Sequence, residues 1–171
     1  RLKGGDPFIY GRGGEEAEQL AQHRVPFEVV PGISAGIAAP AYAGIPVTHR
    51  KMGRSFAVIT GHTESIEQTN WSSYVEGIDT LVIYMGISTL EQIVQKLVSS
   101  GKNQTTPAAI IHWGTTAKQE VITGTLHDLV EKAHAHSIKN PSIIVIGEVV
   151  ALHEKINWFY PDLPLLRSVN N

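Results

Sequence analysis

Short runs rich in valine and isoleucine alternate along this chain with segments of helical periodicity. Several of these runs are continuously apolar, which is typical of strands covered on both faces of a sheet. We expect strands at residues 27–30, 56–60, 80–84, 108–112, 120–123 and 142–150. Because helical segments separate most of these runs, the sequence predicts an α/β fold with a mostly parallel sheet and crossover helices.

The clearest helical pattern covers residues 88–100, where apolar side chains recur at spacings of three and four. Ser88 and Glu91 have the spacing of a capping box at its start, and Gly101 directly follows its end. Further helices are expected at residues 14–23, 34–43 and 125–134.

The composition excludes several classes of protein. Of the 171 residues, 42% are hydrophobic and 18% are charged, which argues against a disordered chain. The net charge of −2 argues against a nucleic-acid partner, and no apolar run is long enough for a membrane span. The absence of cysteine excludes disulfides and a cysteine nucleophile, and suits a reducing compartment. We therefore expect a cytoplasmic protein without membrane or nucleic-acid partners.

Two common kinds of reactive site are also disfavoured. The eight histidines do not have the spacing of metal ligands, so we expect no metal site. No Gly-x-Ser-x-Gly segment marks a serine hydrolase.

A glycine-rich segment at residues 4–14 is the densest candidate for a binding loop. Gly4 and Gly5 allow the backbone to approach a ligand closely, and the carboxylate of Asp6 accepts hydrogen bonds from hydroxyl or ammonium groups. The spacing is neither a dinucleotide-binding fingerprint nor a phosphate-binding P-loop. The alternative interpretation is a structural turn in which the glycines adopt positive φ angles.

Three later segments are weaker candidates of the same kind. Ser34 precedes a run of small residues and could cap a helix that faces a ligand, although small residues also suit close packing. Met85 and Gly114 each follow a predicted strand, and ligands of open α/β sheets bind beyond strand ends. A methionine at such a place is more often part of the core.

Taken in order, these segments resemble the tetrapyrrole methylase family. The resemblance rests on RLKGGDPFIYGRGGEE at residues 1–16, VVPGIS at 29–34, and AYAGIPVTHR at 41–50. It also rests on TGH at 60–62, YMG at 84–86, GT at 114–115, GTL at 124–126 and IGEVV at 146–150. Single pieces would be weak, but the ordered set covers residues 1 to about 160 and is specific. Its motifs are most similar to the branch that methylates uroporphyrinogen III.

This resemblance implies transfer of methyl groups from S-adenosyl-L-methionine to two pyrrole carbons of uroporphyrinogen III. The products would be precorrin-2, which leads to sirohaem and cobalamin, and S-adenosyl-L-homocysteine. The family implies a homodimer of two-domain subunits with the cofactor in the cleft between the domains. Its cofactor contacts carry over onto Gly4, Gly5, Asp6, Ile9, Ser34, Ala35, Met85 and Gly114. Arg50 matches the family's Thr-His-Arg, and we expect it to bind a substrate carboxylate, the alternative being a solvated linker face.

The resemblance also predicts how the chain is divided. We expect residues 1–48 to be the C-terminal part of a first α/β domain, 49–162 a second α/β domain, and 163–171 a tail. The family's opening strand and Gly-x-Gly-Pro-Gly-Asp loop have no counterpart here, so the first domain is expected to be truncated. No catalytic acid or base is identifiable in this chain. Two alternatives remain: another methylase of the same fold, or a catalytically incomplete cofactor-binding fragment.

Overall fold

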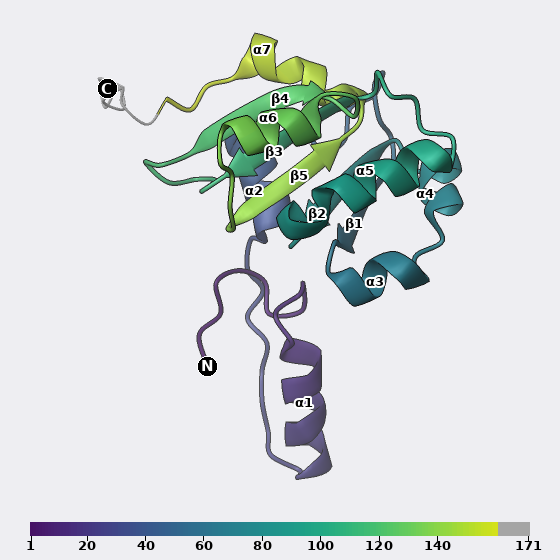
Figure 1. Ribbon diagram of the computed structural model, residues 1–171. Coiled ribbons are helices and arrows are strands. Elements are labelled where there is room, and N and C mark those ends of the chain that lie inside the picture. Colours follow the sequence, from purple (N-terminus) through teal and green to yellow (C-terminus); the bar gives the residue numbers. More distant parts are fainter. Residues whose placement is uncertain (161–171) are drawn as a thin grey trace, which may run out of the picture.

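The computed structural model describes residues 1–160, and its centre is a five-stranded sheet (Figure 1). The strands lie in the order β1-β2-β5-β3-β4. Their bounds are β1 Phe56–Thr60, β2 Thr80–Tyr84, β3 Pro107–His112, β4 Glu120–Thr125 and β5 Ser142–Ile146. Five of the six predicted strands are therefore present, at positions close to those expected.

The sheet is mixed, so the prediction of a mostly parallel sheet is wrong. Only β1 and β2 pair in parallel, whereas β5 is antiparallel to both β2 and β3, and β3 is antiparallel to β4. The segment between β3 and β4 is too short for a crossover, which needs a dozen or more residues, and it forms a hairpin. Crossover helices do join β2 to β3 and β4 to β5, but in each case another strand lies between the two.

Two predicted strand segments adopt other structure. Residues 27–30 are extended and exposed, and no strand within residues 1–160 pairs with them. Strand β5 ends at Ile146 because Gly147 has a φ of 148°, and residues Glu148–Leu152 form a 3-10 helix, η2, instead. An apolar run alone does not distinguish these outcomes from a strand.

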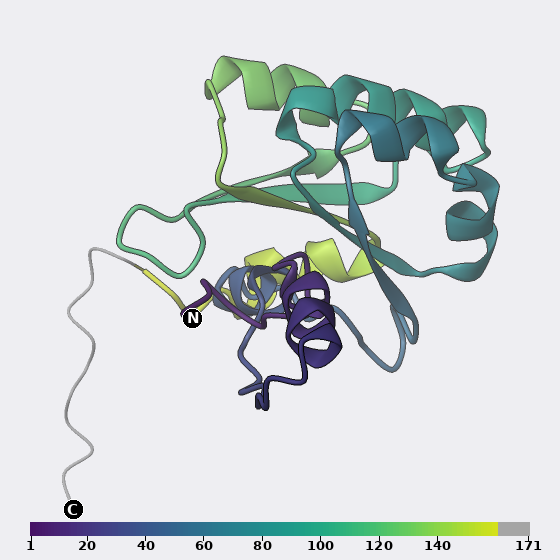
Figure 2. The ribbon, with the colours of Figure 1, turned by 90° about the horizontal axis from the view of Figure 1, so that it is seen from below.

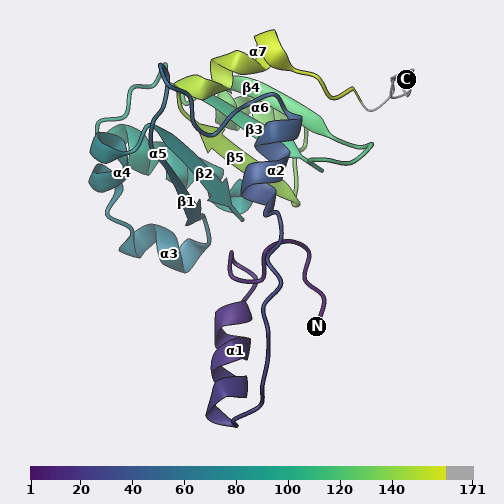
Figure 3. The same cartoon turned by 180° about the vertical axis from the view of Figure 1, so that it is seen from behind.

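Helices cover both faces of the sheet, as Figure 2 shows. On one face lie α3 Thr63–Gln68, α4 Trp71–Gly77, α5 Leu90–Ser99 and α6 Leu129–Ala135. On the other lie α2 Ala35–Tyr42, η2 and α7 His153–Ile156 (Figure 3). Because side chains of a strand alternate in direction, Leu81 and Ile83 join the core under α5, whereas Val82 joins the core under α2.

The start of α5 differs from the capping box expected at Ser88 and Glu91. A short 3-10 turn, η1 Ile87–Thr89, precedes the helix, and its N-cap is the buried Thr89. The Thr89 hydroxyl donates to the Gly61 carbonyl at 2.6 Å, so it joins this turn to the end of β1 rather than capping the helix. Gly101 does end the helix, with a φ of 102°.

The remaining expected helices begin or end near the expected residues, and two helices that were not expected, α3 and α4, are also present. α1 covers Gly13–Gln22, whereas α6 begins only at Leu129 because Thr125 still belongs to β4. The pattern analysis missed α3 and α4, which are short and largely polar. They are fixed by the buried Trp71, whose indole N–H donates to the Ile66 carbonyl at 3.0 Å.

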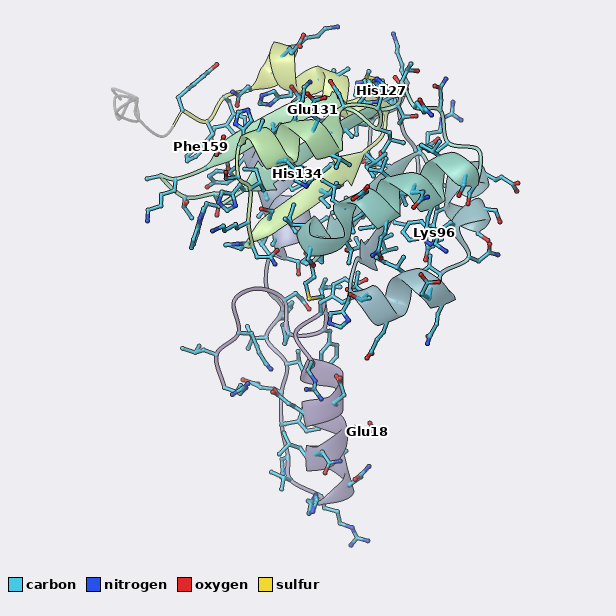
Figure 4. The ribbon with its side chains drawn as sticks, in the orientation of Figure 1. Glu18, Lys96, His127, Glu131, His134 and Phe159 are labelled. Carbon is cyan, nitrogen blue, oxygen red and sulfur yellow. The ribbon has the colours of Figure 1, made fainter. Side chains whose placement is uncertain are left out.

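Helix α1 extends away from the sheet (Figure 1), whereas Tyr10 in the loop before it contacts β1 and β2. Glu18 marks the outer part of α1 in Figure 4. Gly13 is the one buried residue of this helix. No helix among residues 1–160 is both long and apolar enough to cross a membrane. The expected domain boundary at residue 48 stays a prediction, and the boundary at 162 and the expected tail at 163–171 lie outside the described residues.

Asp128 holds the turn between β4 and α6, and we expect it to make the stability of the chain depend on pH. Its Oδ1 accepts from the Thr125 backbone N–H at 2.6 Å, and its Oδ2 lies 2.7 Å from Lys132 Nζ. The bond from Lys132, followed by that from Thr125, lowers the pKa of this carboxyl from 3.8 to about 2. A depressed pKa stabilises the folded chain above pH 3.8, and that contribution is lost as the pH falls through about 2.

Asp128→Asn should therefore lower the free energy of unfolding by about 1 kcal/mol at pH 7, a figure reduced for solvent screening at this exposed position. The difference from the unaltered chain should shrink as the pH is lowered from 5 towards 2.5. Urea unfolding at each pH measures it. Glu131→Gln on the same helix (Figure 4) is the control, because no ion pair holds Glu131 among residues 1–160. A loss that stays constant with pH would contradict the assignment.

Candidate functional site

Three strand ends meet at one edge of the sheet and form the floor of the site. β5 runs antiparallel to its neighbours, so its first residues lie beside the last residues of β2 and β3. Tyr84 pairs with Ile143, and His112 pairs with Ser142. The loops after β2 and β3 and the loop before β5 therefore come together at this edge.

A cleft of about 610 Å³ lies over this edge, next to the start of α2. Its walls are Gly4, Ile33, Ala35, Ala38, Ala39, Tyr84, Met85, Ile111, Trp113, Gly114, Thr115, Thr116, Asn140, Pro141, Ser142 and Ile143. None of these side chains is acidic or basic. The cleft therefore offers backbone groups, hydroxyls and apolar surface, and its volume lies in the range of small-molecule sites.

Three wall residues have left-handed backbone conformations that are uncommon outside glycine. The φ angles are 54° at Met85, 47° at Trp113 and 70° at Thr115. Each such residue costs about 1–3 kcal/mol of strain, and strained residues cluster at functional sites. Here the strain turns the loops after β2 and β3 sharply at the ends of their strands.

Close backbone approaches explain two of the glycines at the site. A Cβ built on Gly114 would lie 2.5 Å from the Cβ of Ala39, so the loop after β3 packs directly on α2. A Cβ built on Gly5 would lie 3.0 Å from the Ile33 carbonyl oxygen, so the glycine-rich loop packs on the segment that leads into α2. In both places a side chain would push the wall away from its neighbour.

Asp6 binds backbone rather than pointing at an open site. Its Oδ1 accepts from the Phe8 N–H at 2.8 Å, and its Oδ2 accepts from the Gly32 N–H at 3.1 Å. The carboxylate thus joins the glycine-rich loop to residues 31–34. Direct contact of Asp6 with a ligand stays a prediction.

A pair of tyrosines connects α2 to the sheet. The Tyr84 hydroxyl accepts a hydrogen bond from the Gly36 N–H in the first turn of α2. The Tyr10 ring lies 5.1 Å from that of Tyr84, and its hydroxyl donates to the Val58 carbonyl at 3.2 Å. Burial, helped by the neighbouring Tyr74 and Tyr84, raises the pKa of Tyr10 above its usual 10.0.

The structure brings four of the eight expected cofactor residues onto the cleft, namely Gly4, Ala35, Met85 and Gly114. Gly5, Asp6 and the buried Ser34 are not among the wall residues, but Gly5 packs on Ile33 and Asp6 binds the Gly32 N–H next to the wall. Ile9 is 43% exposed and is not among the wall residues.

Arg50 lies at the opposite end of the sheet. It is exposed in the turn closed by the pairing of His49 with Gly53. Four residues further on, the Arg54 backbone N–H donates to the carboxylate of Asp79, which directly precedes β2. Arg50 therefore lies near the start of β2. The cleft is at the other end of β2, so the structure does not bring Arg50 to it.

One wall of the cleft, formed by Asn140 and Pro141, was not expected from the sequence. They precede β5, and a mostly parallel sheet would have put them at the far edge. The antiparallel direction of β5 was the missing information, since the sequence between α6 and β5 carries only an Asn-Pro turn signal. Ala38 and Ala39 were recognised as packing residues but not as part of the cleft.

Comparison with known proteins settles the family. The family described as Tetrapyrrole (Corrin/Porphyrin) Methylases matches residues 1–130. The chain belongs to the tetrapyrrole methylase family. A uroporphyrinogen-III C-methyltransferase of Bacillus subtilis (strain 168) is 54% identical over 165 residues, 95% of this methylase chain and 64% of the relative. Siroheme synthase 2 of Aeromonas hydrophila subsp. hydrophila is 56% identical over 160 residues, 93% of this chain and 34% of the relative.

A solved structure shows the same fold. The uroporphyrin-III C-methyl transferase of Thermus thermophilus, complexed with S-adenyl homocysteine, superposes with a TM-score of 0.77 at 32% identity. The match covers 89% of this chain and 66% of the solved chain. The predicted α/β tetrapyrrole methylase-like fold is therefore confirmed. The chain spans 64% of the Bacillus subtilis relative and 34% of the Aeromonas hydrophila siroheme synthase. No three His, Asp or Glu side chains of residues 1–160 are grouped to hold a metal.

The contact of Gly114 with Ala39 gives a direct test of the packing between the loop after β3 and α2. In this chain, Gly114→Ala puts two methyl groups 2.5 Å apart, so the loop must shift. We expect the free energy of unfolding to fall by about 1–3 kcal/mol, as in other overpacked sites. Chemical unfolding followed by circular dichroism measures this.

Gly14→Ala is the matched control, because a Cβ there meets nothing within 4 Å and Gly14 is helical. That variant should be unchanged or more stable by up to about 1 kcal/mol. Equal effects of the two substitutions would show that Gly114 is not packed tightly on α2.

Proposed function

We propose that the protein catalyses S-adenosyl-L-methionine-dependent C-methylation of uroporphyrinogen III at two pyrrole carbons, giving precorrin-2 for sirohaem and cobalamin synthesis. The observation that carries the proposal is the uncharged cleft at the edge where β2, β3 and β5 meet. The family and the relatives named uroporphyrinogen-III C-methyltransferase support this reaction class. The Thermus thermophilus structure supports the cofactor, since it contains S-adenyl homocysteine.

The residues of the cleft fit this cofactor. Its reactive centre is a sulfonium, which supplies the electrophilic methyl group. The soft Met85 thioether suits such a cation, and no lysine or arginine of the wall opposes it. We assign direct cofactor contact to Gly4, Ala35, Met85 and Gly114.

In this proposal, three of the other expected cofactor residues position the wall and do not contact the cofactor themselves. Gly5 and Asp6 fix the glycine-rich loop against residues 31–34, and Ser34 is the N-cap residue of α2. Ile9 lies outside the walls, so we assign it no contact.

A backbone-lined cleft suits methyl transfer to carbon. The reaction depends on holding donor and acceptor in line, where about 7–11 kcal/mol of the barrier is available from positioning alone. The strained loops after β2 and β3 fix the walls before a ligand arrives. No acid or base for the deprotonation of the pyrrole carbon is assigned to this chain, and the wall contains no Asp, Glu, His, Lys or Arg.

Two further expectations belong to the proposal. By the family resemblance the protein acts as a cytoplasmic homodimer. The substrate-binding role of Arg50 stays a prediction, and in this chain it would have to act away from the cleft described above.

Titration calorimetry with S-adenosyl-L-homocysteine tests the cofactor site. We expect the 171-residue chain to bind it, and Met85→Lys to weaken binding at least about 10-fold, or 1.4 kcal/mol, because the bound ligand would cover an ammonium in an uncharged cleft. Ile37→Lys is the control: Ile37 is 41% exposed, close to the 44% of Met85, but is not part of the wall. It should change the affinity less than about twofold.

Turnover separates the remaining alternatives. Labelled S-adenosyl-L-methionine and uroporphyrinogen III should give a product with two labelled methyl groups when the full-length protein is used. Cofactor binding without methylation of uroporphyrinogen III favours another methylase of this fold. No binding of S-adenosyl-L-homocysteine by folded chain contradicts the proposed cleft.

A further inference from the structure

Trp113 presents an exposed indole ring at the wall of the cleft. The side chain is 42% exposed, although burying the large apolar surface of a tryptophan is energetically favourable. Its backbone is fixed: the N–H donates to the Pro141 carbonyl at 3.2 Å, and the carbonyl accepts from the Thr116 hydroxyl at 2.7 Å. The left-handed φ of 47° is a marked outlier for so large a residue. The loop thus keeps this ring exposed to solvent, although the backbone conformation at Trp113 is strained.

The indole N–H of Trp113 is a free donor. Trp71 donates its indole N–H to the Ile66 carbonyl at 3.0 Å, and Trp158 donates to the Ala41 carbonyl at 2.9 Å. Within residues 1–160, by contrast, no group accepts a hydrogen bond from Trp113 Nε1. A donor at the wall of a cleft is available to a ligand.

Lys118 makes a cation–π contact with the same ring. Lys118 Nζ lies 5.7 Å from the centroid of Trp113, and no carboxylate of the described residues forms an ion pair with it. The connecting segment is itself held, because Gln119 accepts from the Thr115 N–H at 2.7 Å and donates to the Tyr42 carbonyl at 3.2 Å. The loop of this β3–β4 hairpin reaches out beyond the sheet (Figure 2), and its residues Trp113, Thr115 and Thr116 line the cleft.

We propose that Trp113 and Lys118 form a substrate platform, on which a pyrrole ring lies against the indole while its carboxylate arm binds Lys118 Nζ and Trp113 Nε1. The inference rests on the proposed function and names the group that receives the tetrapyrrole. Uroporphyrinogen III carries eight carboxylates, and the wall of the cleft contains no cation for them. Lys118 supplies one at the rim. The cationic sulfonium of the cofactor gains nothing from this lysine, so the charge favours the anionic substrate.

Binding of uroporphyrin III, the stable oxidised analogue, tests the platform. Quenching of tryptophan fluorescence gives its dissociation constant, and calorimetry gives that of S-adenosyl-L-homocysteine for the same variants. Trp113→Leu should weaken uroporphyrin III about 10-fold, with Trp113→Phe in between because it keeps a ring face but loses the N–H. Lys118→Gln should weaken it about threefold and reduce its salt dependence. Affinity for S-adenosyl-L-homocysteine should stay within about twofold, which also shows that each variant is folded.

Lys96→Gln is the charge-matched control, since Lys96 lies on α5 across the molecule and pairs with Glu67 at 3.6 Å (Figure 4). It should leave the binding of uroporphyrin III unchanged. Equal effects of Lys96→Gln and Lys118→Gln would show that only the net charge matters, and would overturn the proposed role of Lys118. If Trp113→Leu weakens S-adenosyl-L-homocysteine as much as uroporphyrin III, the ring belongs to the cofactor site. If the unaltered chain binds S-adenosyl-L-homocysteine but not uroporphyrin III, the platform is wrong while the cofactor site stands.

Discussion

The hydrogen bonding of β5 between β2 and β3 decides where this protein has a site. Val145 and Ile144 of β5 pair on one side with Val82 and Ile83 and on the other with Ala109 and Ile110. All of these side chains are fully buried, so the register is fixed by both core clusters at once. Because β5 is antiparallel to both neighbours, the loop before it joins the loops after β2 and β3 at one edge. The cleft exists because those three loops meet.

The contacts of α2 hold the second wall of the cleft. Its first turn is bound by the Tyr84 hydroxyl, its middle packs on Gly114, and its end receives the Gln119 amide. Each of these partners belongs to the sheet or to the hairpin after β3. The small residues of α2 permit this close approach, and the glycine-rich loop is then tied to the start of the helix through Asp6 and Gly32. The wall is therefore held mainly by hydrogen bonds between side chains and backbone groups, and it contains no charged side chain itself.

Charge is arranged in a way that matches the chemistry proposed for the site. The interior of the cleft is uncharged, which suits a sulfonium cofactor and a reaction governed by alignment. The positive charge lies at the rim, where solvent lowers the cost of holding Lys118 without an ion-pair partner. A substrate with many carboxylates needs cations that remain partly hydrated, and a cofactor with a cationic centre needs their absence nearby.

The sequence by itself determined which segments are strands or helices where the apolar pattern is strong, as at β2 and α5. It also placed the glycines, Met85 and Gly114 as binding candidates, because a glycine or a strand end is a local property of the chain. It did not determine the direction of β5, whether residues 27–30 pair with another strand, the partners of Asp6, or the position of Arg50 relative to the cleft. Each of these depends on which distant segment lies alongside. Apolar periodicity reports only that a face is buried, whereas strand order and hydrogen-bond partners are chosen by the packing of the whole core.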